Sequence, residues 1–461
     1  MPLMYTDRSR YEIGVGRCPM LRYLQYHAGP TGYGFRRTAA SLPLVTGTGL
    51  HDGLAPLLTH VMLNDTLPDE DLIRQVIADQ AATYRTQVER RSLADVGEID
   101  PVYLAHLIDE QTSLITGLIW AFALDLLPQL HAENKIISVE VEEALVLDCT
   151  CGIGDRTGTF ADHEAKECNG IGVQGRGDFL TENRQSGMVS YDEFKTTGRL
   201  GQQFETQWET KLQFALGMLG SEARLGKTIY EHLVIGLYKG RRTRSKDPST
   251  GEYTGPKFQD SVFCYGWYRE AEPPLQPEEW KFQYDWIDEL GKKHKLGKKY
   301  QRRPVWEYQV PANFPGTPSE YWVRAMPREI RTKSLLVLGP YNRQDAIIDA
   351  LPAELIGEET RWIDILSALA GIAHGMGVGY WTTPMFQEAL SRRVPRSWEC
   401  RRYGAEYKCE MEAICFRHAG WEDPFRDHRY ELRRPHHAQE LAQMTERGLT
   451  PPEDLAVEES E

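Results

Sequence analysis

The sequence predicts an α/β fold with a compact core of roughly a hundred residues. Three observations support this. A segment rich in Ile and Val follows a long helical region, two more apolar segments are joined by a polar turn, and an apolar helical face precedes a last apolar run. The expected order is strand, strand, strand, helix, strand, over residues 136–147, 172–180, 188–195, 204–219 and 232–238.

Helices are predicted on the N-terminal side of this core. We expect a short helix over residues 18–26, then a polar Gly-rich loop, then a helix that opens near His51. Residues 63–130 are helical in pattern, with Pro101 at a helix start. The apolar face there consists of Leu104, Ile108, Ile115, Ile119 and Ala123.

The chain beyond the core is more heterogeneous. Residues 241–307 are charged and rich in Trp and Tyr, which indicates an insertion, and residues 360–390 are helical in pattern. The sequence thus predicts five divisions: a helical N-terminal region, the core, the insertion, a C-terminal helical region with a cysteine cluster, and a disordered acidic tail. Their bounds are 1–134, 135–240, 241–360, 361–449 and 450–461.

Sequence composition indicates the cellular compartment in which the protein is expected. No positively charged segment followed by an apolar one opens the chain, so no secretory signal is expected. The longest apolar stretch, residues 113–127, is interrupted by Asp125 and stopped by Pro128, so a buried helix is expected and no membrane span. We therefore expect a cytoplasmic protein. Eight cysteines in such a chain favour free thiols or metal ligands over disulfides.

Two carboxylates and a lysine on the predicted hairpin form a candidate hydrolytic site. Side chains alternate along a strand, so Glu193 and Lys195 share a face while Asp192 points away. If the turn centres near residues 185–186, Asp178 lies opposite Glu193. Facing carboxylates repel unless a cation lies between them, and hard oxygen ligands suit Mg²⁺ or Mn²⁺. The alternative is an exposed hairpin with ordinary salt bridges.

These residues resemble the motifs of the RecB-like branch of the PD-(D/E)XK nucleases. That resemblance implies a restriction-endonuclease-like core, a central mixed sheet flanked by helices, and a metal-dependent DNA exonuclease that acts in recombination, repair or phage DNA processing. It makes His51 and the Phe194 carbonyl metal ligands beside Asp178 and Glu193.

A helix motif completes this resemblance. Gln213 matches the family's glutamine, with Gln207 as a rival six residues earlier. The tyrosine that usually follows four residues after the glutamine is replaced here by Gly217.

Four other residues, Cys18, Cys400, Cys409 and Cys415, flank the predicted core. One cysteine before the core and three after it resemble the iron–sulfur subset of RecB-like nucleases, which includes CRISPR-associated exonucleases and the nuclease domain of the AddB helicase subunit. The resemblance implies that these cysteines hold a [4Fe–4S] cluster, with Zn²⁺ as the alternative, in a clip that joins the chain's ends. The spacing departs from the usual Cys-x-x-Cys pair.

A second group of thiols lies within the predicted core. Cys149 and Cys151, with Cys168, form either another candidate thiol group or plain buried or loop thiols.

DNA is the expected partner, although the net charge is −14. A basic run stands out, with Trp and Tyr nearby that can stack on unpaired bases. It consists of Lys292, Lys293, Lys295, Lys298, Lys299, Arg302 and Arg303. A helicase or recombinase subunit is a further expected partner, and a membrane is not. The alternative function is a non-catalytic DNA-binding or scaffold protein on the same core with a structural zinc site.

Overall fold

The computed structural model describes most of the chain, in stretches separated by gaps. These are residues 4–29, 31–37, 42–94, 100–199, 201–246, 250–269, 281–282, 285–287, 293–295, 300–308, 310–374, 376, 381, 383–396, 409, 411, 414–415, 430–435, 438–446 and 449.

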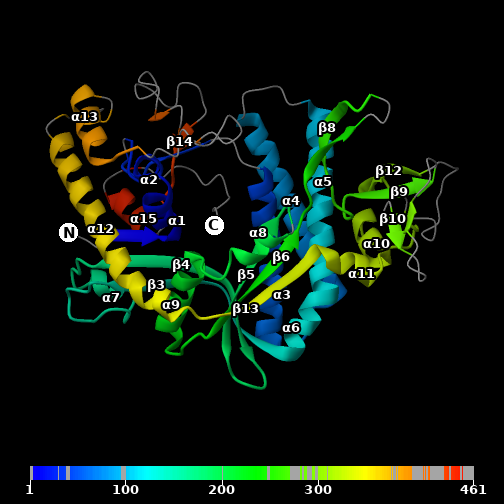
Figure 1. Ribbon diagram of the computed structural model, residues 1–461, viewed down its shortest axis with the longest axis horizontal. Helices are drawn as coiled ribbons and strands as arrows, with labels where there is room; N and C mark the ends of the chain where they lie inside the picture. Colours follow the sequence, from blue (N-terminus) through cyan, green and yellow to red (C-terminus); the bar gives the residue numbers. More distant parts are fainter. Residues whose placement is uncertain are drawn as a thin grey trace.

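A mixed sheet forms the centre of the molecule (Figure 1). Its strands in the described residues are β1 (Met4–Asp7), β3 (Asn134–Leu147), β4 (Ile171–Asn183), β5 (Val189–Thr197), β6 (Glu231–Tyr238) and β13 (Leu335–Asn342). β4 is antiparallel to β3 and β5, β5 is parallel to β6, and β13 closes the sheet antiparallel to β6. The predicted α/β core with a hairpin between its second and third strands is therefore confirmed.

β4 carries two different strands along one of its edges. β3 pairs with β4 along nearly its whole length, whereas β1 pairs with Ile171–Gln174 and β5 with Phe179–Glu182 on the other edge. Between these two partners, residues 175–177 pair only with β3 within the described chain, and residue 178 has no ladder partner. This notch lies at the middle of the sheet and contains Asp178.

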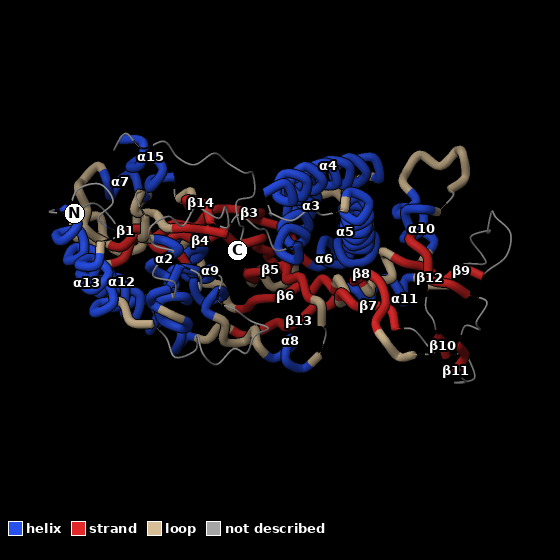
Figure 2. Tube along the Cα trace, turned by 90° about the horizontal axis from the view of Figure 1, so that it is seen from above, coloured by secondary structure: helices blue, strands red, loops and turns tan. Residues whose placement is uncertain are grey.

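Helices cover both faces of the sheet (Figures 1 and 2). On one face α3 (Leu42–Asn64) lies against the sheet and packs with α4 (Glu70–Ala94) and α5 (Pro101–Ala121), which bury Phe179 and Phe194 of the sheet. On the other face α9 (Leu212–Leu225) and α12 (Asp345–His374) bury Leu180 and Tyr191. Alternate residues of each strand therefore enter two separate cores.

α5 is continuous with a π-helical turn (Phe122–Leu126) and α6 (Leu127–Glu133). Together, as residues 101–133, they are long and apolar enough to cross a membrane, but 83% of the most apolar window is buried inside the protein. The expectation of a buried helix is confirmed.

The helix that carries His51 begins earlier than predicted. It starts at Leu42, so His51 lies in its interior and the Gly-rich segment before it is helical. The glycines allow close approach to neighbouring elements: a Cβ on Gly53 would lie 2.5 Å from Ile119 Cδ1, and one on Gly47 would lie 3.2 Å from Thr196 Oγ1. Tertiary packing outweighs the low helix propensity of these glycines.

Helix boundaries differ elsewhere as well. The segment 204–219 is two helices, α8 (Gln202–Thr206) and α9, separated by a break at residues 207–211. The long helical region before the core is divided into α3, α4 and α5, because residues 65–69 and the Pro101 start interrupt it.

The sheet also draws on segments outside residues 135–240. β1 comes from the N-terminal region and β13 from the segment assigned to the insertion, while α12 crosses the boundary drawn at residue 360. A four-residue strand such as β1 has no usable periodicity, and β13 is placed by its pairing with β6. The central sheet is therefore built from segments of three of the predicted divisions, not from residues 135–240 alone.

The insertion forms small sheets beside α5 (Figure 1). Its elements are β7 (Arg242–Lys246), β8 (Tyr253–Gln259), β9 (Tyr265–Arg269), β10 (Asp285–Ile287), β11 (Lys293–Lys295), β12 (Tyr300–Pro304), α10 (Pro318–Ala325) and α11 (Arg328–Arg331). The Phe263 ring fills the space that a side chain would take at Gly117 of α5. The insertion thus shares the core beneath α5.

The two ends of the chain fold together into one lobe (Figure 1). It contains α1 (Arg8–Glu12), α2 (Pro19–Tyr26), β2 (Phe35–Arg37), α13 (Pro384–Arg393), β14 (Tyr430–Leu432) and α15 (Ala438–Glu446). β2 pairs with β14, and a fully buried ion pair joins Arg22 of α2 to Glu359 of α12. Residues far apart in sequence therefore share one core.

Candidate functional site

Three carboxylates form a row across the sheet at the notch. Glu140 of β3 lies opposite Asp178 of β4, between the pairs Val139–Phe179 and Val141–Gly177. On the other side the β4–β5 ladder ends at Phe179–Asp192, and Asp178 and Glu193 come one step beyond it. The predicted register of the hairpin is thus observed, with Glu140 as an additional member.

Asp178 is held at both carboxylate oxygens. Its Oδ1 lies 3.1 Å from His51 Nδ1, and its Oδ2 accepts a hydrogen bond of 2.6 Å from the Phe194 backbone N–H. Burial disfavours the charged form of Asp178, but His51, Lys195 and the Phe194 N–H outweigh that cost and lower its pKa. Burial also opposes protonation of His51, yet Asp178 raises the His51 pKa overall. An ionised Asp178 is therefore the expected state.

The alternation of both β4 and β3 changes at this point. In β4, Val173 faces the α9 side and Gly177 lies against the Tyr191 ring on that side, but Phe179 faces the α3 side. In β3, Glu140 has a φ of 49°, a left-handed conformation that is uncommon for any residue other than glycine. The irregularity thus lies at the two opposed acids, and it is the kind of local strain found at functional sites.

Glu140 has the properties of an incomplete cation site. Its Oε2 is buried and makes no hydrogen bond within the described structure, although Arg176 Nε lies 2.8 Å away as an ion-pair partner. Burial and then the neighbouring Asp178 raise the Glu140 pKa to about 7, against the opposing effect of Arg176. Ligand atoms of His51, Glu140 and Asp178 all lie within 4.8 Å of one another.

This group fits a divalent cation. Two carboxylates and an imidazole form an oxygen-rich ligand set with one nitrogen, which suits Mn²⁺ and Mg²⁺ better than soft metals. A cation among these groups would also relieve the repulsion between Glu140 and Asp178.

Glu193 lies at the centre of a second set of contacts. It is fully buried, its Oε1 accepts a 2.9 Å hydrogen bond from the Tyr191 hydroxyl, and its Oε2 lies 2.7 Å from Lys195 Nζ. Gln213 of α9 donates from Nε2 to the same Oε2. Gln207 lies in the break after α8, where its Nε2 donates to the Phe204 carbonyl. Of the two glutamines, Gln213 is the one that reaches the site.

Tyr191 occupies the space left by the glycine on α9. A Cβ placed on Gly217 would lie 2.2 Å from the Tyr191 ring, and one on Gly177 would lie 2.8 Å from it. The ring is therefore held between two glycines, with its hydroxyl on Glu193. The helix motif lacks a tyrosine at residue 217, and a tyrosine from β5 lies at that place.

Asp192 and Phe194 point away from Glu193, as strand alternation predicts. Asp192 is buried and accepts hydrogen bonds from Thr181 and Ser190, and burial raises its pKa to about 7. The Phe194 ring packs on Phe122 and Phe179. Its backbone N–H orients Asp178, and its role as a carbonyl ligand stays a prediction.

A separate group of metal-ligating side chains lies in the connection between β3 and β4. Cys149, Cys151 and Cys168 meet His163, with all four ligand atoms within 4.8 Å of one another. This arrangement is compatible with a metal site. Sequence reasoning noted the three thiols and missed the histidine, because α7 (Phe160–Glu164), which carries it, is only five residues long.

The other cysteine set is described in part. Cys18 and Cys415 are buried in the terminal lobe, where Cys409 packs against the same core, and Cys400 lies outside the described residues. The three described cysteines share one cluster although they are far apart in sequence. Whether they hold a metal stays a prediction.

The basic run is described only in part, because Lys292, Lys298 and Lys299 lie outside the described residues and so do the side chains of Lys293 and Lys295. The Arg302 guanidinium lies over the Phe258 and Tyr265 rings at 4.1 and 4.6 Å and pairs with Asp260. The Arg302 side chain is therefore engaged in contacts within the insertion, whereas Arg303 is exposed.

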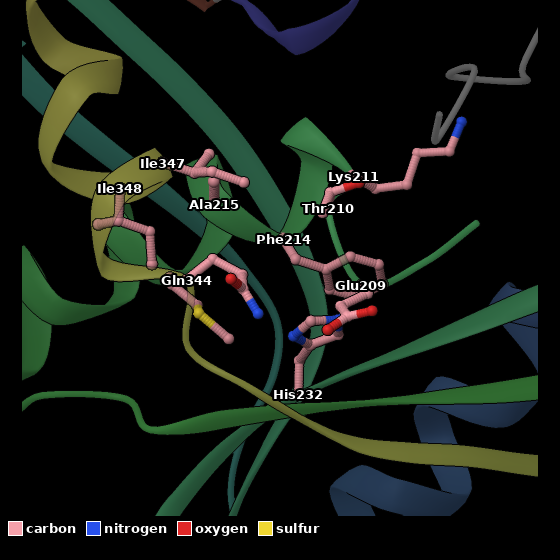
Figure 3. Close-up of a pocket in the computed structure, with 10 residues that line it drawn as sticks. Glu209, Thr210, Lys211, Phe214, Ala215, His232, Gln344, Ile347 and Ile348 are labelled. Atoms are coloured by element: carbon pink, nitrogen blue, oxygen red, sulfur yellow. The ribbon is translucent and has the colours of Figure 1, made fainter. Parts of the chain in front are cut away.

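A small pocket lies between α9, β6 and the start of α12 (Figure 3). Its lining includes Phe214, His232 and Gln344 and none of the residues of the carboxylate row. The His232 ring stacks on Phe214 at 4.0 Å between ring centres. The pocket is therefore distinct from the candidate site.

No protein-family model matches the chain, and no curated protein matches it either.

Proposed function

We propose that the protein is a metal-dependent deoxyribonuclease of the PD-(D/E)XK type, an exonuclease that hydrolyses DNA phosphodiester bonds. One observation carries the proposal. His51, Asp178, Glu193, Lys195 and Gln213, chosen from sequence motifs that span more than 160 residues, converge at a single notch in the sheet. Asp178, Glu193 and Lys195 meet through the hairpin itself, whereas His51 reaches them from α3 and Gln213 from α9.

The proposed metal ligands are His51, Glu140 and Asp178, with Glu193 beside them. A Mg²⁺ or Mn²⁺ ion bound there would lower the pKa of a water molecule and polarise the scissile phosphate. Asp178 is kept ionised by its neighbours, so it is ready to bind a cation at neutral pH. The Phe194 N–H and His51 fix its orientation.

Lys195 supplies the positive charge that such hydrolysis needs near the phosphate. Its side chain is only 18% exposed, and its ammonium group is oriented by Glu193. In the proposed reaction Lys195 donates a hydrogen bond to a phosphate oxygen as negative charge builds there. Tyr191 and Gln213 hold Glu193, so they position Lys195 indirectly.

DNA is the proposed substrate because the site resembles a phosphodiester-hydrolysing one. Exposed Arg303 and the lysines of the basic run are the proposed phosphate contacts, and Arg302 is removed from that set. A helicase or recombinase subunit remains a proposed partner.

The test is cleavage of end-labelled linear duplex and single-stranded DNA by the full chain, with Mg²⁺, with Mn²⁺ and with a chelator. We expect cleavage with either metal and none with the chelator. Asp178→Asn and Glu140→Gln should each slow cleavage by about a hundredfold or more, because each removes a ligand charge. Glu142→Gln, an exposed acid two residues from Glu140 on β3, should leave the rate unchanged.

His51→Ala should weaken the response to metal concentration more than it weakens DNA binding. The proposal fails if the wild-type chain cuts neither substrate with either metal, or if Asp178→Asn cuts as fast as Glu142→Gln.

A non-catalytic DNA-binding or scaffold protein is the second candidate function. The observation that favours this candidate is the metal-compatible group of Cys149, Cys151, His163 and Cys168, which indicates a structural metal site. DNA binding without any cleavage in the same assay would support this candidate.

A further inference from the structure

The connection between β3 and β4 brings three thiols and one imidazole together without a bond between them. Cys149 Sγ lies 3.5 Å from Cys151 Sγ and 3.9 Å from Cys168 Sγ. His163 Nδ1 lies 3.5 Å from Cys149 Sγ and 3.4 Å from Cys151 Sγ. A disulfide requires about 2.0 Å between sulfurs, so these thiols are placed as separate groups around a common centre.

These separations are those of a tetrahedral zinc site. With Zn–S of about 2.3 Å and Zn–N of about 2.0–2.1 Å, a tetrahedron separates two sulfurs by about 3.8 Å and a sulfur from a nitrogen by about 3.6 Å. These four distances lie within a few tenths of an ångström of those edges. We propose that Cys149, Cys151, His163 and Cys168 bind one structural Zn²⁺ ion.

His163 is oriented as a metal ligand would be. Its Nε2 lies 2.7 Å from the Thr157 carbonyl, which can only accept, so Nε2 carries the proton and Nδ1 presents its lone pair to the sulfurs. A capping box between Thr159 and Asp162 begins the short helix that carries this fully buried ring. Metal-bound histidines are commonly oriented by a carbonyl in this way.

Two sulfurs also receive donors from the surrounding chain. The Gly154 backbone N–H lies 3.4 Å from Cys149 Sγ, and the Thr150 hydroxyl lies 3.8 Å from Cys168 Sγ. Donors directed at sulfur favour the thiolate form, which is the form that binds a metal.

The connection has only a small apolar core of its own. Residues 148–170 contribute only Phe160 and Cys168 to a small buried cluster with Tyr5 and Val146, and Cys149 and Cys151 pack against it. Left-handed backbone conformations occur at Asp148, Arg156 and Glu167 as well as at several glycines of the segment. A chain this irregular with so small a core is typical of segments stabilised by a metal.

A single ion fits better than an iron–sulfur cluster. In a [4Fe–4S] cluster each cysteine binds its own iron, so the four ligands surround a body much wider than one ion. The sulfur and nitrogen atoms here are separated by the edges of one coordination sphere. Thiolate and imidazole ligands with no open position are typical of structural Zn²⁺.

The proposed role is to anchor β1. Tyr5 of β1 packs edge-on against Phe160 with ring centres 5.4 Å apart, and β1 pairs with β4 from Ile171, three residues after Cys168. Zinc would thus fix the connection that supports one border of the notch.

The experiment measures zinc and iron per chain in the purified full-length protein by elemental analysis. Zinc is first added to the growth medium and excess metal is removed by gel filtration. We expect close to one zinc per chain. Cys151→Ser and Cys168→Ser should each lose most of it, whereas His163→Cys, which supplies a fourth thiolate, should retain it.

Matched controls are Cys264→Ser, a buried cysteine outside both groups, and Cys18→Ser, which tests the terminal set; both should keep their zinc. Circular dichroism must show that the variants are folded, and protease cleavage within residues 148–170 should accelerate when a chelator removes the metal. Zinc-free wild-type protein after exposure to Zn²⁺ would overturn the proposal. So would zinc that is lost from Cys18→Ser but kept in Cys151→Ser and Cys168→Ser, or iron in place of zinc at this group.

Discussion

At the residue scale, Tyr191 fills the space beside Gly217 of α9. Its ring lies between Gly177 and Gly217, and its hydroxyl donates to Glu193 at 2.9 Å. The alternation of β5 puts Tyr191 on the same face as Glu193, so the sequence contained the signal. The sequence does not show that the Tyr191 ring contacts Gly217 of α9, because that contact depends on how the helix packs on the sheet.

Tyr191→Phe should lower the cleavage rate about tenfold and also destabilise the protein, because the hydroxyl that is removed is a buried donor to Glu193. The variant keeps the ring and removes a single hydrogen bond to a charged group, which is worth about 1.5–3 kcal/mol. Steady-state cleavage should show the loss in kcat with KM for DNA preserved. Wild-type kcat in Tyr191→Phe would mean that the hydroxyl does not position Glu193.

His232 predicts a pH dependence of stability that is separate from activity. Its ring is buried beside Phe214 and Tyr341, its Nδ1 has no hydrogen-bond partner within the described chain, and burial lowers its pKa to about 4 (Figure 3). In the unfolded chain the histidine has a pKa of about 6.5. Below that pH the unfolded chain therefore binds a proton at this residue, whereas the folded protein keeps the ring neutral until the pH approaches 4. The stabilising contribution is therefore complete above pH 6.5 and is lost as the pH falls from there toward 4.

His232→Gln should flatten the stability curve in that window. Over its full width the wild-type protein should lose up to about 3 kcal/mol through this one group. Urea unfolding at a series of pH values between 4 and 8 measures the slope. Equal slopes in the two proteins would show that His232 is not buried in its neutral form.

At the scale of elements, α3 carries His51 to the notch because its glycines let it approach its neighbours. Gly→Ala in a helix interior normally stabilises by about 1 kcal/mol. At Gly53 the added methyl group would lie 2.5 Å from Ile119 Cδ1 and 3.2 Å from Gln80 Cγ, so overpacking should dominate.

Gly53→Ala should therefore destabilise the protein by about 1–3 kcal/mol and also slow cleavage, since His51 lies two residues away. Gly357→Ala is the matched control: this glycine is exposed in α12, and a Cβ there would meet no atom within 4 Å. It should stabilise by about 0.5–1 kcal/mol. Chemical denaturation measures the free energy of unfolding of both variants. If Gly53→Ala raised this free energy as Gly357→Ala does, the close approach of α3 to α5 would be contradicted.

The sequence predicted the individual strands and their hairpin better than the pairing of distant strands and the start of α3. Strand periodicity and turn residues placed the β4–β5 hairpin and the opposition of Asp178 and Glu193 correctly. Glu140 was missed because its position opposite Asp178 depends on the β3–β4 register and on a left-handed residue that no pattern encodes. The start of α3 was missed because glycines predict a loop until a packing partner is known.

In the whole molecule, the N-terminal helices and the C-terminal elements share one core and are joined by a buried ion pair. Arg22 and Glu359 are both fully buried and form two hydrogen bonds, and Thr6 donates to the same carboxylate. Such a pair joins the N-terminal helices to α12 across more than 300 residues of chain. The cysteine clip expected from the sequence would add to a lobe that already has this ionic centre.

Glu359→Gln should cost about 3–5 kcal/mol, because it leaves the Arg22 charge buried without a counter-ion. Glu388→Gln, which breaks an exposed pair with Arg392 one turn away on α13, should cost less than about 0.5 kcal/mol. Urea unfolding of both variants measures the difference. A small effect of Glu359→Gln would mean that water reaches the Arg22 guanidinium and that the lobe is more open than described.

We propose above that the notch in the sheet hydrolyses DNA with a bound divalent cation. Lys195 tests this claim most directly, because it touches Glu193 without belonging to the proposed ligand set of His51, Glu140 and Asp178. The measurement is the single-turnover rate of linear DNA cleavage in Mn²⁺ by the wild-type chain and by Lys195→Ala, with Mn²⁺ and DNA binding measured for both. The account predicts retained binding of both ligands and a rate reduced by about a hundredfold or more. Cleavage by Lys195→Ala at the wild-type rate would contradict it.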